Sequence, residues 1–380
     1  MKIIVAFGTR PEAIKMAPLI LELRKYPLEF EVQVCVTGQH REMLYQVLEI
    51  FQINPEIDLD VMTPGQNLSE TTSRILLGMG KVFEQEKPDL VLVHGDTSTT
   101  FATALAAFYK NIPVGHVEAG LRTYNIKSPF PEEFNRQAVS RIATLHFAPT
   151  QGCANNLISE FVDKSRIYVT GNTVIDAIEW VLRRVNEDSV FAQKVIEILN
   201  SKIDFDWQSK PFVLVTGHRR ENFGKGFEEI CRAIAESASR YPDLRFIYPV
   251  HMNPQVQEPV KRILGNSGNV ILIEPLDYVA FSMLLARCSF VLTDSGGVQE
   301  EAPTLGKPVL LMRDTTERPE SIERGTTYLV GASMTSILGG ISRLIEDNQW
   351  RESMSLVHTA YGDGHAAKKI VSILRELVNL

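Results

Sequence analysis

Short apolar runs rich in β-branched residues alternate along this chain with segments of helical period. Phe101, Leu105 and Tyr109, for example, form an apolar face at i, i+4 and i+8. This alternation is typical of parallel sheets covered by helices, and it predicts an α/β fold. The strands are predicted in two series, the first at 2–7, 31–36, 90–93, 114–117, 145–148 and 167–169 and the second at 212–216, 245–249, 270–273, 290–292 and 309–311.

The second series begins after a polar, poorly periodic stretch, "NSKIDFDWQSKP", which we interpret as the connection between two domains. With 380 residues, of which 44% are hydrophobic, the chain is too long for one typical domain. We predict an N-terminal Rossmann-like domain over 1–185 and a C-terminal one over 186–365. A final helix within 366–380 could pack back on the N-terminal domain. The two doubly wound sheets are expected to face a central cleft, since such sheets bind ligands at the carboxyl ends of their strands.

Charge and cysteine usage exclude several classes of protein. The net charge of -7 argues against a nucleic-acid-binding protein, so any anionic ligand must be held by a few placed cations. The four cysteines show no CxxC pair and HExxH is absent, which disfavours disulfide frameworks and zinc sites. Neither a signal peptide nor a run of about 18 apolar residues is present, so we expect a soluble, cytoplasmic protein that does not bind membranes.

Candidate site residues of the first half lie just after predicted strands. Arg10 and Lys15, in "FGTRPEAIK", open a helix whose N-terminal amides bind anions, although a turn with solvated cations would also explain them. The junction "GDTST" is either a helix cap or a ligand site. Glu118 follows another strand, and Glu132 and Arg136 begin a helix as an i, i+4 pair that a surface salt bridge would also explain.

The second half repeats this placement. Residues 295–297 of "TDSGGVQEEAP" end a strand and open a helix, so their amides can approach a diphosphate, and Glu300 or Glu301 could accept from ribose hydroxyls. His218 stands beside two arginines in "VTGHRREN", and His251 follows a strand in "YPVHMNP" and is placed near the cleft. The other histidines of interest are interpreted as ordinary structure: His94, His116 and His365.

Taken in order, "GTRPEAIKMAPL", "HGDTSTTFA", "HVEAGLRT", "PFPEEFNR", "TGNTVIDA", "TGHRREN" and "DSGGVQEEAPTLGKPVLLMRDTTERPE" make the chain resemble the non-hydrolysing UDP-N-acetylglucosamine 2-epimerases of bacteria. The resemblance runs from residue 3 to about residue 330. It implies two Rossmann-like domains of the GT-B type, a homodimer, and no metal or redox cofactor. It also implies an isomerase that supplies UDP-N-acetylmannosamine for cell-envelope polysaccharide biosynthesis.

The resemblance also implies roles for individual residues. To the UDP moiety it assigns Arg10, Phe281, Ser295, Gly296, Gly297, Glu301 and Arg318. To the sugar and its chemistry it assigns Lys15, Asp96, Glu118, Glu132, Arg136 and His218.

The chemistry of the implied reaction explains why many ionisable groups are needed. The C2 hydrogen of the sugar is not acidified by a carbonyl, so the family eliminates UDP, forms 2-acetamidoglucal and adds UDP back. Inversion requires proton-handling groups on both faces of the ring, for which Asp96, Glu118 and Glu132 are the candidates, together with cations for the leaving diphosphate. His218, with Arg10 and Ser295, is expected to stabilise UDP as it leaves.

Several members of this family are activated by their own substrate at a second site. The corresponding segments here, "TGQHREM" and "TPGQNLSE", supply Gln39, His40, Glu42 and Gln66 as candidate residues of such a site. Some Gram-positive members have Arg-Gln where this chain has Gly65-Gln66, so we expect at most a modified form of activation.

Four alternatives share parts of this pattern. A glycosyltransferase of the same architecture would need an acceptor groove, for which the sequence shows no sign. A hydrolysing epimerase would release free N-acetylmannosamine, and an epimerase of diacetamido-uronic nucleotide sugars tends to read "GARPQFIK" where this chain reads "GTRPEAIK". A non-catalytic nucleotide-sugar sensor would not need to retain Asp96, Glu118 and Glu132, all of which are present.

Overall fold

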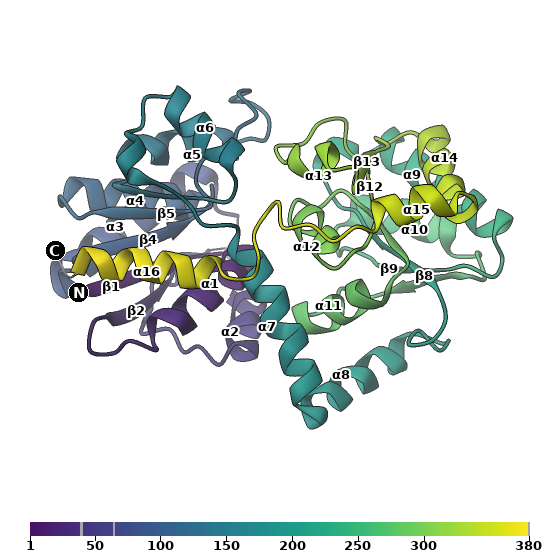
Figure 1. Cartoon of the computed structure of the whole chain (residues 1–380), viewed down its shortest axis with the longest axis horizontal. Coiled ribbons are helices and arrows are strands. Elements are labelled where there is room, and N and C mark those ends of the chain that lie inside the picture. The colour runs from purple at the N-terminus through teal and green to yellow at the C-terminus, as the bar shows by residue number, and fades with distance from the viewer. Residues whose placement is uncertain (39–40, 64, 379–380) are drawn as a thin grey trace. The chain divides into compact units, whose positions relative to one another are not determined.

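Two parallel sheets with flanking helices make up the fold, which confirms the predicted α/β class (Figure 1). The structure is a computed structural model that describes residues 1–38, 41–63 and 65–378. The chain divides into unit 1, Met1–Trp180 with Tyr361–Leu380, and unit 2, Val181–Ala360. In the described part of the chain, no helix is long and apolar enough to cross a membrane.

Unit 1 contains a seven-stranded sheet in the order β3-β2-β1-β4-β5-β6-β7, with every pairing parallel. Its strands are β1 Lys2–Phe7, β2 Glu31–Val36, β3 Ile57–Asp58, β4 Leu90–His94, β5 Val114–Val117, β6 Leu145–Ala148 and β7 Ile167–Val169. Its helices are α1 Arg10–Leu23, α2 Arg41–Ile50, α3 Leu68–Glu86, α4 Ser98–Tyr109, α5 Glu132–Ile142, α6 Gln151–Ser159, the first part of α7 Thr173–Glu187, and α16 Ala366–Val378.

The central strands of unit 1 are buried on both faces, which is why their sequences are continuous apolar runs. Ile4 and Ala6 pack with Val91 and Val93 against the apolar faces of α3, α4 and α5. Because side chains alternate along a strand, the intervening residues of β1 and β4 face the other side of the sheet. The sheet therefore presents the carboxyl ends of β1, β4 and β5 at one edge, where the candidate residues of the first half lie.

Unit 2 contains a six-stranded parallel sheet in the order β10-β9-β8-β11-β12-β13. Its strands are β8 Phe212–Thr216, β9 Arg245–Pro249, β10 Val270–Ile273, β11 Phe290–Thr293, β12 Val309–Leu311 and β13 Thr327–Leu329. Its helices are the end of α7, α8 Ser189–Lys202, α9 Lys225–Arg240, α10 Pro254–Leu264, α11 Tyr278–Arg287, α12 Val298–Thr304, α13 Glu320–Glu323, α14 Met334–Glu346 and α15 Asn348–Met354.

The polar segment interpreted as a connection, residues 200–211, is irregular after its first three residues, which end α8. The division between the units falls earlier in the chain, within α7. Trp207, which follows α8, is 2% exposed, and its indole Nε1 donates to Asn200 Oδ1 at 2.9 Å. An apolar anchor therefore fixes this stretch, although its composition is largely polar.

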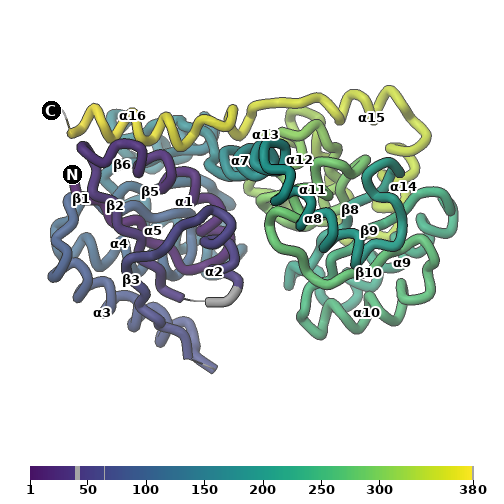
Figure 2. Tube along the Cα trace, turned by 90° about the horizontal axis from the view of Figure 1, so that it is seen from below, coloured from purple at the N-terminus to yellow at the C-terminus, as the bar shows by residue number. Residues whose placement is uncertain are grey.

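The C-terminal helix α16 packs on unit 1, where it lies beside α1 (Figures 1 and 2). The carboxylate of Asp176 in α7 accepts from the backbone amides of Ala366 and Ala367, at 3.1 and 2.9 Å, and so caps the first turn of α16. At the other end of α16, Arg375 forms a salt bridge with Glu29 at 2.7 Å. Residues distant in the sequence therefore complete unit 1.

Two buried histidines lie side by side in the sheet of unit 1. His116 of β5 is in register with His146 of β6, and His116 Nε2 lies 2.7 Å from the carbonyl oxygen of Gly95. Burial lowers the pKa of His116 to about 3 and the pKa of His146 to about 4, from an ordinary value of 6.5. Both rings are therefore neutral in the folded protein at neutral and mildly acidic pH.

We predict that these histidines make unit 1 sensitive to acid. Because both folded-state pKa values lie below 6.5, the unfolded chain binds protons first as the pH falls, and the stabilisation present above pH 6.5 is lost toward pH 4. Each histidine adds a slope of about 1.4 kcal/mol per pH unit to the free energy of unfolding. Urea unfolding between pH 7 and pH 4.5 measures this slope.

In that experiment the variant His116→Gln should show a flatter pH dependence than the wild-type protein. His365→Asn, at an exposed position, serves as the control and should keep the wild-type slope. Equal slopes for His116→Gln and the wild-type protein would contradict the prediction.

Candidate active site

The turns after β1 and β4 are joined by the buried carboxylate of Glu12. Its four hydrogen-bonding partners are Gly8 N at 3.0 Å, Thr9 N at 2.8 Å, Thr97 Oγ1 at 2.6 Å and Thr100 Oγ1 at 3.2 Å. Burial raises the pKa of Glu12, and these hydrogen bonds oppose that shift. Thr97 is also the N-cap of α4, so the "GDTST" junction is a helix start that is fixed to the first turn of α1.

Glu118, directly after β5, is the centre of a buried polar cluster. Its Oε2 forms a salt bridge with Lys15 Nζ and accepts from Asn172 Nδ2 at 2.6 Å, and His94 Nε2 lies 3.8 Å from the same oxygen. All four residues are at most 9% exposed. The ammonium group and the amide both favour an ionised carboxylate. The structure therefore brings together two predicted site residues, Lys15 and Glu118, from different strand ends.

A second pair lies in the same unit. Arg136 of α5 forms a salt bridge with Asp96, the residue after Gly95, and Asn135 Nδ2 donates to the backbone oxygen of Asp96 at 2.8 Å. Gly95 lies beside Glu118, since a Cβ added to Gly95 would be in van der Waals contact with Glu118 Oε1 at 3.5 Å. The Asp96–Arg136 and Glu118–Lys15 pairs therefore lie at the same edge of the sheet.

The first turn of α5 differs from the expected i, i+4 pairing. The helix partner of Arg136 is Glu133, whose Oε2 lies 3.4 Å from Arg136 Nη1, and Glu133 also accepts from the backbone amides of Thr123 and Tyr124, at 3.1 Å each. Glu133 is fully buried, whereas Glu132 is half-buried at the start of the helix. Glu133 therefore fixes the loop before α5, and Glu132 remains the more accessible of the two acids.

In unit 2, Asp294 fixes the loop that carries His218. Asp294 follows β11, is fully buried, and accepts through Oδ2 from the backbone amides of His218 and Arg219, at 2.9 and 2.8 Å. Asn222 Nδ2 lies 3.4 Å from the same oxygen and donates to the carbonyl oxygen of Met312 at 3.0 Å. Since β8 and β11 are neighbours in the sheet, one carboxylate holds the loops after both strands.

The rings of His218 and His251 are stacked, with centroids 4.9 Å apart and an interplanar angle of 9°. His251 Nδ1 accepts from the backbone amide of Asn253 at 3.1 Å, which places the proton of the neutral ring on Nε2. Burial and the neighbouring His218 lower the pKa of His251. The structure thus brings these two predicted site residues into direct contact, with the His218 side chain 44% exposed.

Arg318 belongs to a chain of alternating charges in unit 2. Its guanidinium forms salt bridges with Glu300 and Glu317, and Glu317 pairs in turn with Arg313 at 3.0 Å. Burial disfavours the ionised form of Glu317, but Arg318, Arg313 and Arg219 outweigh this effect and hold the pKa of Glu317 well below its ordinary value. Arg318 is therefore held in a fixed orientation by two buried carboxylates.

The glycine-rich turn after β11 lies against this arginine. A Cβ added to Gly296 would lie 2.9 Å from Arg318 Nη1, so any other residue there would require the guanidinium to shift. Gly297 precedes α12 without a side-chain cap, and Ser295 is half-buried. Glu301 Oε1 accepts from the hydroxyl of Tyr278 at 2.7 Å, in α11, the helix that also carries the half-buried Phe281.

The remaining predicted site residues are placed as follows. Arg10 begins α1 and is half-buried. Gln66 Oε1 accepts from the backbone amide of Thr63 at 3.1 Å. Gln39 and His40 lie outside the described residues, and Glu42 belongs to α2. Substrate activation at these positions therefore stays a prediction, and a hyperbolic rate curve without a lag would argue against it.

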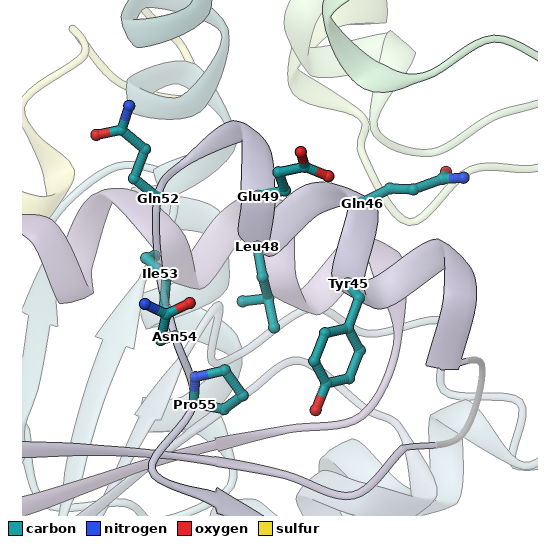
Figure 3. A pocket seen from close by; sticks show the side chains of 8 residues that line it. All are labelled: Tyr45, Gln46, Leu48, Glu49, Gln52, Ile53, Asn54 and Pro55. Carbon is teal, nitrogen blue, oxygen red and sulfur yellow. The ribbon is translucent and has the colours of Figure 1, made fainter.

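A surface cavity of about 610 Å³ lies along α2 and the turn that follows it, and in Figure 3 Tyr45 and Leu48 project from one side of the helix and Glu49 from the other. Its lining residues are Tyr45, Gln46, Leu48, Glu49, Gln52, Ile53, Asn54 and Pro55. None of the residues described in the clusters above belongs to this set. Within the described ranges, no group of three or more His, Cys, Asp or Glu residues could hold a metal ion.

Several residues of these clusters were not predicted as site residues. His94, interpreted as ordinary structure, lies beside Glu118, and its position at the end of β4 directly before "GDTST" was the available signal. Asn172 stands in the "TGNTVIDA" motif that supported the resemblance. Glu133 is adjacent to the predicted Glu132, but nothing in the sequence distinguishes which of the two acids is buried.

Comparison with known proteins shows the family to which the chain belongs. A family model described as UDP-N-acetylglucosamine 2-epimerase matches residues 21–375. The chain is 54% identical over 375 residues to the UDP-N-acetylglucosamine 2-epimerase of Escherichia coli K12, covering 99% of this chain and 98% of that protein.

Solved structures agree with the sequence relatives. The crystal structure of the Neisseria meningitidis UDP-GlcNAc 2-epimerase bound to UDP-GlcNAc has a TM-score of 0.94 and 48% identity, covering 99% of this chain and 100% of that chain. The Methanocaldococcus jannaschii enzyme in complex with UDP-GlcNAc and UDP has a TM-score of 0.85 and 33% identity, covering 99% of this chain and 100% of that chain. The chain therefore belongs to the UDP-N-acetylglucosamine 2-epimerase family of isomerases.

Proposed function

We propose that this enzyme interconverts UDP-N-acetylglucosamine and UDP-N-acetylmannosamine by reversible elimination of UDP. The observation that carries the proposal is the pair of salt bridges at one sheet edge of unit 1, Lys15 with Glu118 and Arg136 with Asp96. These pairs place carboxylates that can exchange protons beside cations that can orient a sugar. Crystal structures of relatives bound to UDP-GlcNAc and UDP support a nucleotide sugar as the ligand.

In the elimination step, the bond between C1 of the sugar and the diphosphate oxygen breaks, and UDP leaves with the bonding electrons. A carboxylate accepts the C2 proton, and a C1–C2 double bond forms, which gives 2-acetamidoglucal. In the second step a protonated carboxyl on the opposite face returns a proton to C2 while a UDP oxygen bonds to C1. The two carboxyl groups then regain their initial protonation states by exchange with solvent, so the epimer forms with no net consumption of water or cofactor.

Inversion at C2 needs proton-transfer groups on both faces of the ring, and we assign this chemistry to Asp96, Glu118 and Glu132. Glu118 is the most deeply placed of the three, and Glu132 is half-buried at the start of α5. Carboxyl groups in a closed site can exchange protons near working pH because burial and neighbouring charges adjust their proton affinity. Lys15 and Arg136 orient two of the three acids.

We assign the UDP moiety to unit 2 and to Arg10. Arg318, held between Glu300 and Glu317, presents a fixed guanidinium beside Gly296, and the glycine turn 295–297 allows close approach of a diphosphate. His218 is accessible enough to stabilise the leaving diphosphate, and His251, Phe281 and Glu301 complete the proposed ligand contacts. Removing one such charge-stabilising group typically costs about 2–4 kcal/mol of barrier.

The other properties expected from the sequence stay predictions. They are the assembly as a homodimer, the location in the cytoplasm, the absence of a required cofactor, and the use of the product in cell-envelope polysaccharide biosynthesis.

The elimination route predicts solvent exchange at C2. In D2O, with UDP-N-acetylglucosamine and no added metal or nucleotide cofactor, NMR should show UDP-N-acetylmannosamine with deuterium at C2. Asp96→Asn, Glu118→Gln and Glu132→Gln should each slow this exchange by about 100-fold or more, because each removes a proton-transfer group. Glu84→Gln changes an exposed acid of α3 and should exchange at the wild-type rate.

Other products in this experiment would favour the alternatives. Free N-acetylmannosamine would indicate a hydrolysing enzyme, since water would then have reached the intermediate. Tight UDP binding without any exchange at C2 would contradict the proposal and favour a glycosyltransferase or a sensor.

The proposed UDP site predicts that Gly296→Ala weakens UDP binding. The new methyl group would displace the Arg318 guanidinium, and we expect the Kd for UDP to rise about tenfold, or about 1.4 kcal/mol. Isothermal titration calorimetry measures this change. Gly268→Ala is the matched control, because an added Cβ there has no neighbour within 4 Å, and an equal loss in both variants would contradict the assignment.

A further inference from the structure

Asn172, between β7 and α7, is the residue from which this inference starts. We propose that Asn172 is a positioning residue that sets the proton affinity of Glu118 and thereby the pH dependence of epimerisation. The inference rests on the proposed role of Glu118 in proton transfer. Asn172 is 2% exposed, and its side chain reaches Glu118 across 54 positions of sequence.

Hydrogen bonds at both Oδ1 and Nδ2 fix the orientation of the Asn172 side-chain amide. Oδ1 accepts from the backbone amide of Val174 at 3.1 Å, and Nδ2 donates to Glu118 Oε2 at 2.6 Å. Turning the amide over would place the NH2 group against the Val174 N–H and the carbonyl oxygen against the carboxylate, and so would lose both hydrogen bonds. Asn172 is therefore a donor to Glu118, and a donor favours the ionised form of a carboxylate.

The backbone of Asn172 is fixed as firmly as its side chain. Its N–H donates to the carbonyl oxygen of Tyr361 at 2.6 Å, and Tyr361 is itself 2% exposed. The preceding Gly171 packs against Gly362 so closely that an added Cβ would lie 2.9 Å from the Cα of Gly362. The amide therefore has little freedom to follow Glu118 if the carboxylate moves, and it defines where Glu118 Oε2 is held.

Lys15 of α1 shares this oxygen and His94 Nε2 of β4 lies 3.8 Å from it, so the charged and titratable neighbours of Glu118 Oε2 stay in place when position 172 is changed. The ammonium group supplies charge, and the neutral amide supplies a directed hydrogen bond. Replacing the amide while keeping Lys15 isolates the effect of the hydrogen bond on the proton affinity of Glu118. An aspartate at position 172 is nearly isosteric and retains the acceptor for Val174 N. When ionised, it presents a second negative charge where the donor was.

The test is the pH profile of kcat/KM for UDP-N-acetylglucosamine in the wild-type enzyme, Asn172→Ala and Asn172→Asp. The part of this profile in which activity changes as Glu118 ionises should move to higher pH by about one unit in the alanine variant. It should move further in the aspartate variant, because two carboxyl groups in contact resist simultaneous ionisation. A role in packing alone gives the opposite order, with aspartate closest to the wild-type enzyme and activity lowered equally at every pH; that order would overturn the inference.

A control variant and a reference variant separate the possible failures. Asn156→Asp retains the Oδ1 acceptor for Tyr124 and loses only the donor to the carbonyl oxygen of Gly120. Its pH profile of kcat/KM should therefore match that of the wild-type enzyme. If Glu118→Gln keeps the wild-type rate of C2 exchange, the proposed role of Glu118 is wrong and this inference is wrong with it. If Glu118→Gln is inactive but the Asn172 variants keep the wild-type pH profile, only the inference about Asn172 is overturned.

Discussion

The hydrogen bonds to the buried carboxylate of Glu12 are the interaction on which the arrangement of unit 1 depends. They join the turns after two neighbouring strands, so the helix starts that carry Lys15 and Asp96 keep a fixed relation to each other. Asp294 performs the same task in unit 2, where one carboxylate holds the loops after β8 and β11. In both units a buried acid with several donors holds the turns that carry the residues assigned to the chemistry. A buried carboxylate that lost these donors would be costly to retain, because a charge away from water must be paired or hydrogen-bonded.

Glu118 shows how this scaffold supports a strained residue. Its φ of +62° lies in the left-handed region, which costs a non-glycine residue of this kind about 1–3 kcal/mol. The strained backbone directs the side chain toward Lys15 and Asn172, whose contacts offset part of that cost. A glycine would adopt the same backbone without strain but would leave both donors without their acceptor. The contacts of the glutamate side chain, and not the backbone conformation, therefore explain why position 118 is a glutamate rather than a glycine.

The sequence predicted the strands well because parallel strands covered on both faces are continuous apolar runs. It did not predict β3 and β13, because Ile57–Asp58 is only two residues long and β13 exposes Tyr328 and Leu329. The composition of the stretch around Trp207 is largely polar, and an average over that composition does not reveal that this one side chain is buried.

The candidate site was also predictable only where local sequence determines position. Residues that follow strands could be located, because the topology of a parallel sheet gathers strand ends at one edge. The contact between Asn172 and Glu118 could not be predicted, since it depends on how the loop before α7 lies against the turn after β5, and neither local period nor residue spacing encodes that distance.

Unit 1 is built from two separate parts of the chain, which has a consequence for how the protein is made. Because α16 completes unit 1, the ribosome must synthesise all of unit 2 before unit 1 receives its last helix and the Asp176 carboxylate receives its two amide partners. Unit 2, which is continuous in sequence, can complete its sheet during translation. Unit 1 exposes the surface that α16 will cover until all of α16, Ala366–Val378, has been synthesised.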